Sequence, residues 1–425
     1  MRRRISNGRI IDPANGIDAL GDICIDDDHI VSVLKSPADF SPDQEINAVG
    51  MLVCPGFVDL CARLREPGQE QKANIASESL AAAGAGITTI CCPPDTQPVI
   101  DTSAVVELIH QRAEAINKTR IYPLGALTHA LEGQRLADMH TLKRAGCAGV
   151  SNANRPVENT EVLRRAMEYA ASFDITLFLH PEDHYLRNHG VVHEGPVSTR
   201  LGLPPIPSTA ETIAISRALL LMEQTGVKVH FCRISSRRSV SMIAEARQAG
   251  LPVSADVGIC YLRLSEENVD NYNTNCHMIP PLRARSDMQA LREGVEEGVI
   301  DAVCSDHQPH DDDAKSAPFS ETEPGASTLD LLFPLLNELV NDDALSLNHA
   351  IAVLTVNPAR ILGLELGTLS IGADADITII NPGKKWQVDK ANLLSAGKNT
   401  PFDGWELTGK VTHTLLRGRI VYAEG

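Results

Sequence analysis

The sequence contains no apolar run long enough to cross a membrane, and acidic residues outnumber basic ones. Hydrophobic residues make up 43% of the 425 residues, yet none of the apolar stretches approaches the roughly 18 uninterrupted residues that a membrane span needs. The formal net charge is -17, whereas binding to a nucleic-acid backbone requires clustered Lys and Arg. We therefore expect a soluble protein whose partners include neither a membrane nor a nucleic acid.

We also expect neither an export signal nor a disulfide framework. Residues Met1 to Arg4 carry the charge of a signal peptide's first segment, but Ile5 to Gly8 follow where an apolar core of roughly 7–15 residues would be needed. The ten cysteines form no CxxC pair, and several of them, such as Cys91 and Cys304, lie inside apolar runs. These features predict reduced, buried thiols and a cytoplasmic protein.

Short apolar or β-branched runs do recur along the chain, and each is followed by a stretch with helical periodicity. Eight such runs can be counted, at residues 57–60, 88–91, 121–124, 148–150, 175–179, 227–234, 253–257 and 300–304. This alternation is typical of parallel strands joined by crossover helices, and eight repeats favour a closed (β/α)8 TIM-type barrel over a doubly wound sheet. The predicted fold is therefore α/β, with the barrel in residues 55–360.

The two ends of the chain have a different pattern. Residues 1–54 and 361–425 contain strand-like alternating segments separated by turn residues such as Asn7-Gly8 and Asp12-Pro13. We expect these two segments to form one small β-sandwich domain beside the barrel.

The segment Pro55 to Gly68, which reads PGFVDLCARLREPG, closely resembles the first-strand signature of the dihydroorotases, PGFxDxHxHLREPG. Further motifs of that family follow in the same order along the chain: Pro94 to Val99, Pro123 to Ser151, His180 to Asp183, Ile234 to Ser236, Pro280 to Arg283, Ser305 to His310 and Asn357 to Arg360. The resemblance covers nearly the whole chain and implies the barrel and β-sandwich of the amidohydrolase superfamily.

In that family, one or two zinc ions at the carboxyl end of the barrel lower the pKa of a bound water and polarise the carbonyl of a cyclic amide. The resemblance places Cys61 and Arg63 where the first strand should supply two histidines. The fourth-strand ligand segment, Val150 to Asn154, has no carboxylate, and the sixth-strand histidine position falls on Arg233. The positions that are kept are Asp59, His180 and Asp306.

Two arginines make a metal site unfavourable. A dication about 5 Å from one guanidinium is repelled by roughly 6–7 kcal/mol at an effective dielectric of about 20. A structural zinc site gains only about 10–16 kcal/mol in total. We therefore expect no metal, no cofactor and no catalytic residue, with Arg63 and Arg233 filling the former metal space and pairing with Asp59 and Asp306. If a metal were held, its ligands would be Cys61, His180 and Asp306.

The substrate-binding positions are only partly kept. The resemblance places Arg65 and His310 at two positions that hold the pyrimidine acid in the family. Asp95 replaces an asparagine that contacts the substrate carboxylate, and Ile279 replaces a second asparagine. A carboxylate at position 95 should repel an anion. This combination argues against ordinary affinity for dihydroorotate.

The chain is most similar to a non-catalytic, dihydroorotase-like branch of the family that assembles in some bacteria with aspartate carbamoyltransferase, in pyrimidine biosynthesis. This resemblance implies a structural role, with a homo-dimer inside a larger hetero-oligomer that contains the aspartate carbamoyltransferase catalytic chain. One alternative is an active cyclic amidohydrolase of the dihydroorotase, hydantoinase or allantoinase type, with zinc at a rebuilt site that uses Cys61, Cys232 or Cys260. Another is a sensor that binds a pyrimidine acid through Arg65 and His310.

Overall fold

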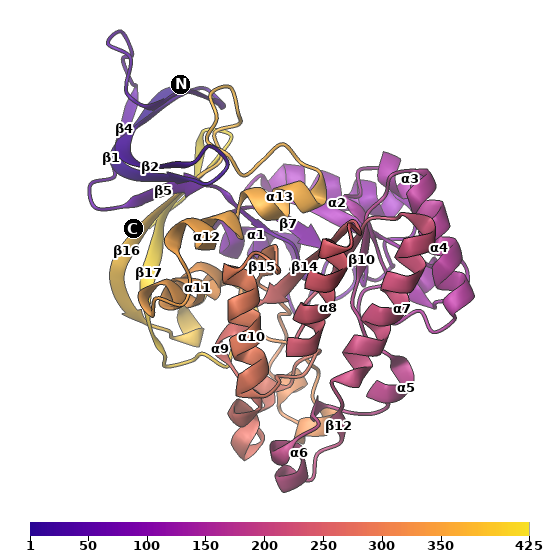
Figure 1. Cartoon of the computed structure of the whole chain (residues 1–425). Helices are drawn as coiled ribbons and strands as arrows, with labels where there is room; N and C mark the ends of the chain where they lie inside the picture. The colour runs from indigo at the N-terminus through magenta and orange to yellow at the C-terminus, as the bar shows by residue number, and fades with distance from the viewer. Residues whose placement is uncertain (425) are drawn as a thin grey trace.

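The computed structural model describes residues 1–424, which form a barrel with a separate β-sheet on one side (Figure 1). The barrel has eight parallel strands in the order β15-β14-β13-β10-β9-β8-β7-β6. Their bounds are β6 (Phe57–Asp59), β7 (Ile87–Cys92), β8 (Arg120–Ala126), β9 (Gly149–Ser151), β10 (Leu177–Leu179), β13 (Val229–Phe231), β14 (Val253–Gly258) and β15 (Ala302–Cys304). Each strand overlaps one of the eight predicted runs, so the barrel prediction is confirmed.

The barrel closes between its first and last strands through a short seam. A single bridge pairs Ala62 with His307, just beyond the ends of β6 and β15. The backbone N–H of Arg63 donates to His307 O at 2.9 Å, and the N–H of His307 donates to Cys61 O at 3.2 Å. The last strand is thus joined to the first at the carboxyl end of the barrel, which is where barrel enzymes carry their active sites.

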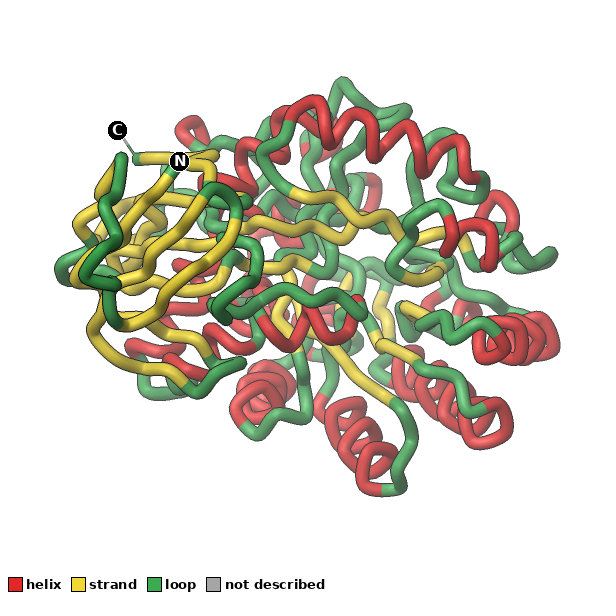
Figure 2. Tube along the Cα trace, turned by 90° about the horizontal axis from the view of Figure 1, so that it is seen from above, coloured by secondary structure: helices red, strands yellow, loops and turns green. Residues whose placement is uncertain are grey.

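Helices surround the barrel on the outside, as the view from above shows (Figure 2). Their bounds are α1 (Ile75–Gly84), α2 (Ser103–Ile116), α3 (Met139–Arg144), α4 (Thr160–Ser172), α5 (His184–Arg187), α6 (Pro196–Leu201), α7 (Thr209–Thr225), α8 (Arg237–Gln248), α9 (Ile259–Arg263), α10 (Arg285–Glu296), α11 (Leu332–Asn341), α12 (Leu347–Ala352) and α13 (Val356–Leu362). The long helices are amphipathic: α10 buries Ala290, Leu291, Gly294 and Val295 on one face. Two short strands, β11 (Val192–His193) and β12 (Pro205–Ile206), pair outside the barrel.

The second sheet combines the two ends of the chain, as predicted. Its eight strands are β1 (Arg2–Asp12), β2 (Ile17–Asp26), β3 (His29–Leu34), β4 (Gln44–Asn47), β5 (Leu52–Pro55), β16 (Ile377–Gln387), β17 (Glu406–Leu416) and β18 (Arg419–Ala423). Strand β5 joins the two halves, because it pairs in parallel with β1 and antiparallel with β16. The indigo and yellow ends of the chain therefore lie together in Figure 1.

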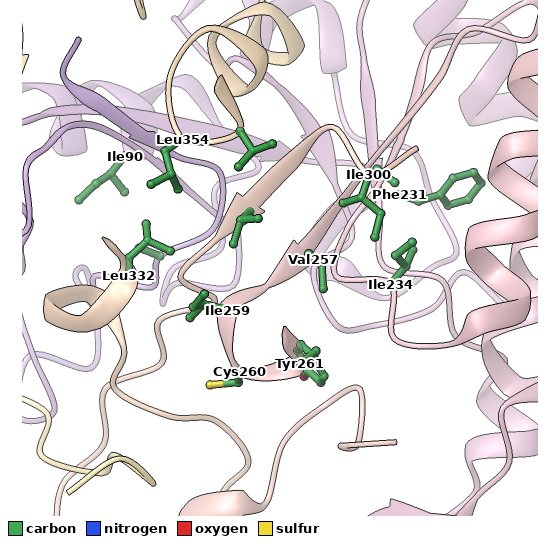
Figure 3. Close-up of a cluster of buried hydrophobic side chains, with 14 of the residues drawn as sticks. Ile90, Phe231, Ile234, Val257, Ile259, Cys260, Tyr261, Ile300, Leu332 and Leu354 are labelled. Carbon is green, nitrogen blue, oxygen red and sulfur yellow. The ribbon is translucent and has the colours of Figure 1, made fainter. Parts of the chain in front are cut away.

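Apolar packing forms separate cores in the barrel and in the terminal sheet. Figure 3 shows part of the barrel core, where Phe231 of β13 and Val257 of β14 are fully buried. Side chains of this size each stabilise the fold by about 1.5–3 kcal/mol when they are removed from water. The sheet has a core of its own, with Ile10, Ile23 and Ile377.

All ten cysteines are free thiols, as expected, and all except the partly exposed Cys232 are buried. None of the helices in residues 1–424 combines the length and the apolar character that a membrane span requires.

Candidate functional site

The residues that the sequence singled out follow the carboxyl ends of neighbouring barrel strands. Cys61 and Arg63 follow β6, His180 follows β10, Arg233 follows β13 and Asp306 follows β15. Arg233 and Asp306 have left-handed backbones, with φ of 54° and 47°. Such conformations cost about 1–3 kcal/mol each in non-glycine residues and cluster at functional sites. The barrel mouth therefore has a strained backbone at two of the positions that the sequence singled out.

Asp306 is the centre of this cluster and binds both arginines. Its Oδ1 accepts a hydrogen bond from Arg233 Nη1 at 3.1 Å and another from Gln308 Nε2 at 3.0 Å. Arg63 Nη1 lies 3.7 Å from the same oxygen. The two arginine side chains are only 5% and 3% exposed. The predicted pairing of Arg63 and Arg233 with Asp306 is thus confirmed.

The predicted pairing of an arginine with Asp59 is wrong. Asp59 Oδ1 accepts from the backbone N–H groups of Ser305 at 2.9 Å and Cys61 at 3.3 Å, and Oδ2 accepts from the Ser305 hydroxyl. Burial raises the pKa of Asp59, and the hydrogen bonds from Ser305 oppose this effect. The barrel seam brings Ser305 against Asp59, so this carboxyl group needs no arginine.

Asp95, which was expected to face the substrate carboxylate, forms an ion pair with Arg63 instead. Arg63 Nε donates to Asp95 Oδ2 at 2.8 Å. Burial alone would raise the pKa of Asp95, but the guanidinium of Arg63 outweighs it and lowers this pKa. The expected repulsion between Asp95 and an anion is therefore offset by Arg63, which the sequence pattern placed in the metal space instead.

Arg65 and His310 lie next to each other, and their side chains make hydrogen-bond contacts with the protein itself. Arg65 Nε donates to Pro309 O at 3.0 Å, and Arg65 Nη2 lies 3.1 Å from His310 Nε2. Burial and the neighbouring Arg63 lower the pKa of Arg65 to about 10. Burial and the charges of Arg65 and Lys72 lower the pKa of His310 to about 2, so its ring is neutral.

The suggested ligand set of Cys61, His180 and Asp306 does not converge. In the described part of the chain, only His230, Cys232 and Asp256 bring three potential ligand atoms within 4.8 Å of one another. Burial raises the pKa of the Cys61 thiol far above its ordinary value, and its Sγ lies 3.7 Å from Asp306. The carboxylate of Asp306, which is shared by the two guanidinium groups of Arg63 and Arg233, does not fit a zinc ligand.

His230 and Asp256 were missed by the sequence analysis. Both ring nitrogens of His230 and both carboxylate oxygens of Asp256 already have hydrogen-bond partners. His230 Nε2 lies 2.8 Å from Asp256 Oδ2, and its Nδ1 lies 2.8 Å from Ser254 Oγ. Asp256 Oδ1 accepts the backbone N–H of Arg233 at 2.6 Å. This group is a closed hydrogen-bond network that orients the strand end carrying Arg233. The spacing of His230, Cys232 and Arg233, at the end of β13 and just after it, is a sequence signal that could have indicated this network.

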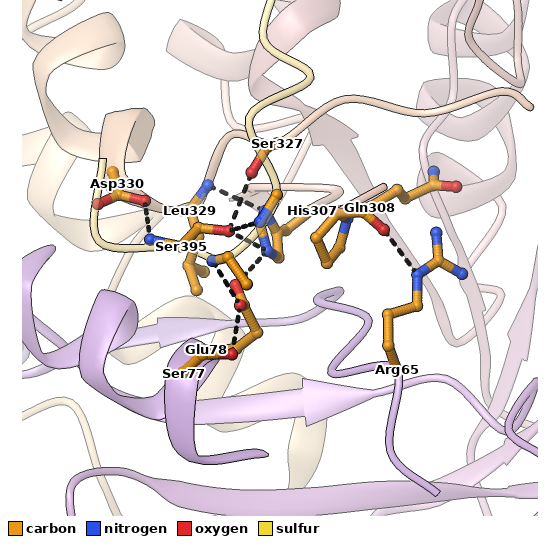
Figure 4. Close-up of polar contacts among 12 residues, drawn as sticks. Arg65, Ser77, Glu78, His307, Gln308, Ser327, Leu329, Asp330 and Ser395 are labelled. Carbon is orange, nitrogen blue, oxygen red and sulfur yellow. Dashed lines mark hydrogen bonds and ion pairs between the residues drawn. The ribbon is translucent and has the colours of Figure 1, made fainter. Parts of the chain in front are cut away.

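A second buried network lies beside the mouth, between α1 and β15 (Figure 4). Glu78 Oε2 lies 2.7 Å from His307 Nε2. Thr328 N–H donates to His307 Nδ1 at 3.1 Å, so the ring proton sits on Nε2 and is donated to Glu78. Glu78 Oε1 also accepts the N–H of Ala396 at 3.0 Å. The network joins α1, the barrel seam and the segment before β17.

Thiol reactivity tests this description of the cysteines. We expect none of the ten thiols to react rapidly with Ellman's reagent in the native protein. Nine of them are buried, and burial raises the pKa of the partly exposed Cys232 well above its ordinary value. All ten should react after unfolding in guanidinium chloride. Rapid labelling of Cys61, identified by peptide mass spectrometry, would show that it is an accessible thiolate.

Comparison with known families and proteins agrees with this fold. Residues 50–239 match the family described as "Dihydro-orotase-like", and residues 287–422 match the "Amidohydrolase family". A dihydroorotase-like protein of Pseudomonas putida is 44% identical over 98% of both chains. A dihydroorotase of Syntrophus aciditrophicus is 43% identical over the full length of both.

Solved structures share the same architecture. The L-hydantoinase (dihydropyrimidinase) of Arthrobacter aurescens superposes with a TM-score of 0.90 over all of this chain and 96% of its own, at 24% identity. The dihydropyrimidinase of Brevibacillus agri gives a TM-score of 0.86 at 22% identity, over all of this chain and 95% of its own. At such low identity these likenesses show the fold alone.

Proposed function

Because this chain belongs to the dihydroorotase-like family of amidohydrolases, we propose that it is a non-catalytic member that assembles with the catalytic chain of aspartate carbamoyltransferase and supports it in pyrimidine biosynthesis. In this role the chain is a cytoplasmic scaffold that needs no metal. It forms a homo-dimer within a larger hetero-oligomer, and the transferase supplies the active site.

The arrangement around Asp306 carries this proposal. One family ligand position is filled by Arg233, which bonds to Asp306 at 3.1 Å, and another by Arg63, which lies 3.7 Å from the same oxygen. A dication at this point would meet two buried guanidinium groups, each repelling it by roughly 6–7 kcal/mol at about 5 Å. The carboxylate that would bind metal is already neutralised. A well-folded barrel with such a mouth supports a role in assembly better than one in hydrolysis.

Co-purification tests the partner. The chain, tagged at its native locus, should elute from size exclusion together with aspartate carbamoyltransferase, identified by mass spectrometry. Deleting the gene should reduce the stability or the activity of the transferase. Elution as a free homo-oligomer at low salt, with the transferase elsewhere, would contradict the assembly role.

Metal content separates this proposal from an active cyclic amidohydrolase, which the relatives named dihydroorotase keep open. We expect the purified chain to hold far less than one zinc per polypeptide and to show no turnover of dihydroorotate, hydantoin or allantoin. Stoichiometric zinc that is lost in Cys61→Ala, together with turnover, would instead establish a rebuilt metal site.

A further inference from the structure

We propose that a cavity at the amino end of the barrel binds a small phosphate monoester. The cations of the cavity wall hold the phosphate, and apolar side chains contact the organic group of the ester. The cavity lies at the end of the barrel opposite the mouth, so this inference stands whether or not the mouth holds a metal.

The cavity has the size of a small-molecule site. Its volume is about 650 Å³, and ligand pockets in proteins commonly span about 300–1,000 Å³. The residues around it include the first residues of three barrel strands, Gly149 of β9, Val229 of β13 and Val253 of β14. Helix α13 covers one side, and Figure 1 shows this helix at the end of the barrel away from α6.

Small side chains and paired strands keep this space open. Ala148, Thr176 and Ser254 line the cavity where barrels usually carry bulky branched side chains. The N–H of Leu177 donates to Lys228 O at 3.0 Å, so the beginnings of β10 and β13 are held together. The cavity is therefore formed by the fixed framework of the barrel before any ligand binds.

The wall of the cavity carries more positive than negative charge. Its charged residues are four cations and two carboxylates, namely Lys143, Lys228, Arg247, Arg360, Asp174 and Asp301. Lys228 Nζ lies 2.7 Å from Asp174, and Arg247 Nη2 lies 2.6 Å from Asp301. Both carboxylates are thus already paired, and two positive charges remain in a chain whose net charge is -17.

The two remaining cations, Lys143 and Arg360, have free donors. Lys143 Nζ donates to Phe173 O at 2.9 Å and to Asp174 O at 2.8 Å, which leaves its third N–H unused. These carbonyls follow the end of α4, where the helix dipole offsets only about half a positive charge. The side chain of Arg360 forms no ion pair and no hydrogen bond within residues 1–424.

This combination of groups suits a phosphate monoester. Such a group carries about -1.5 to -2 charges at neutral pH, which matches the two surplus cations. The planar guanidinium of Arg360 can bind two phosphate oxygens at once. Leu251, Pro252 and Ile361 also line the cavity and remain at least partly exposed. They offer an apolar surface that inorganic phosphate alone would leave uncovered.

Calorimetry with phenyl phosphate tests the proposal on the purified protein, with any partner retained. At neutral pH and constant ionic strength, phenyl phosphate should bind saturably to one site per chain. Inorganic phosphate, which lacks the ring, and succinate, which carries two separated carboxylates, should bind at least about tenfold more weakly. The proposal is overturned if phenyl phosphate does not bind, or if succinate binds as tightly.

Three variants locate the site. Arg360→Ala should lower the affinity for phenyl phosphate at least about tenfold. Its midpoint of thermal unfolding without ligand should not change, because the side chain is exposed and has no partner in the described chain. Arg165→Ala removes an exposed arginine of α4 that pairs with Glu161, so it is the charge-matched control and should keep the affinity. Arg65→Lys, at the barrel mouth, should keep it as well. Loss of binding in Arg65→Lys but not in Arg360→Ala would place the ligand at the mouth and contradict the proposal.

Discussion

Replacing Arg233 by leucine is expected to destabilise the protein by about 3–5 kcal/mol, because it leaves the buried carboxylate of Asp306 without its nearest cation. Arg233 Nη1 lies 3.1 Å from that carboxylate, whereas Arg63 Nη1 is 3.7 Å away. The loss should appear as a lower midpoint of urea unfolding with little change in slope.

Two further variants test whether the unpaired charge of Asp306 causes this loss of stability. Arg238→Leu removes an exposed arginine that pairs with Glu245 on α8, with side chains 62% and 63% exposed, and should cost no more than about 1 kcal/mol. The double variant Arg233→Leu/Asp306→Leu should recover most of the stability, because no charge is left unpaired. A cost of less than about 1 kcal/mol for Arg233→Leu alone would show that Asp306 does not depend on this arginine.

Substitution of Glu78 by glutamine is expected to cost about 2–4 kcal/mol. The carboxylate accepts from His307 Nε2, from the backbone of Ala396 and from the hydroxyl of Ser77. An amide group cannot accept all three bonds, so at least one buried donor is left without an acceptor. Glu245→Gln, on the exposed face of α8, is the control and should be nearly neutral.

The effect of Glu78→Gln should depend on pH. Burial opposes the charge on Glu78, but its hydrogen bonds with His307 and Ala396 outweigh burial and lower its pKa below the ordinary value of 4.5. A carboxyl group with a lowered pKa stabilises the fold above its ordinary pKa, and this contribution is lost as the pH falls through the folded-state pKa. The difference in the free energy of unfolding between the unchanged protein and Glu78→Gln should therefore be largest at pH 6–7 and decrease in acid. A difference that does not change with pH would show that Glu78 is uncharged in the fold.

The fold could be predicted largely from the sequence. Eight apolar runs with helical stretches between them indicate the barrel, because strands buried on both faces are apolar throughout. The pairing of the two ends was also predictable, since residues 1–54 and 361–425 show strand-like alternation. The predicted turn at Asn7-Gly8 is wrong, because both residues lie inside β1, where the register with β2 shifts between Ile5 and Gly8. What these patterns do not contain is the register that closes the barrel.

The site could be predicted only in part, because the sequence patterns do not show which distant strands are paired. The positions of Arg63 and Arg233 at strand ends follow from the motifs, but their partners do not. Ser305 lies 246 residues from Asp59, and their contact depends on the seam. Asp95 lies 32 residues from Arg63, and their contact depends on the pairing of β6 with β7. No spacing rule identifies them. The carboxylate of Glu78 was missed because it lies in a helix whose other buried residues are mainly small and apolar.

The seam between β6 and β15 also constrains how the protein is made. At synthesis rates of about 5–20 residues per second, the ribosome needs roughly 12–50 s to add the 246 residues that separate Asp59 from Ser305. During that interval β6 cannot pair with β15, and Asp59 has no hydrogen bond from Ser305. Vectorial folding of this barrel can therefore end only after its last strand has left the ribosome, so the order of synthesis fixes the order in which the mouth is assembled.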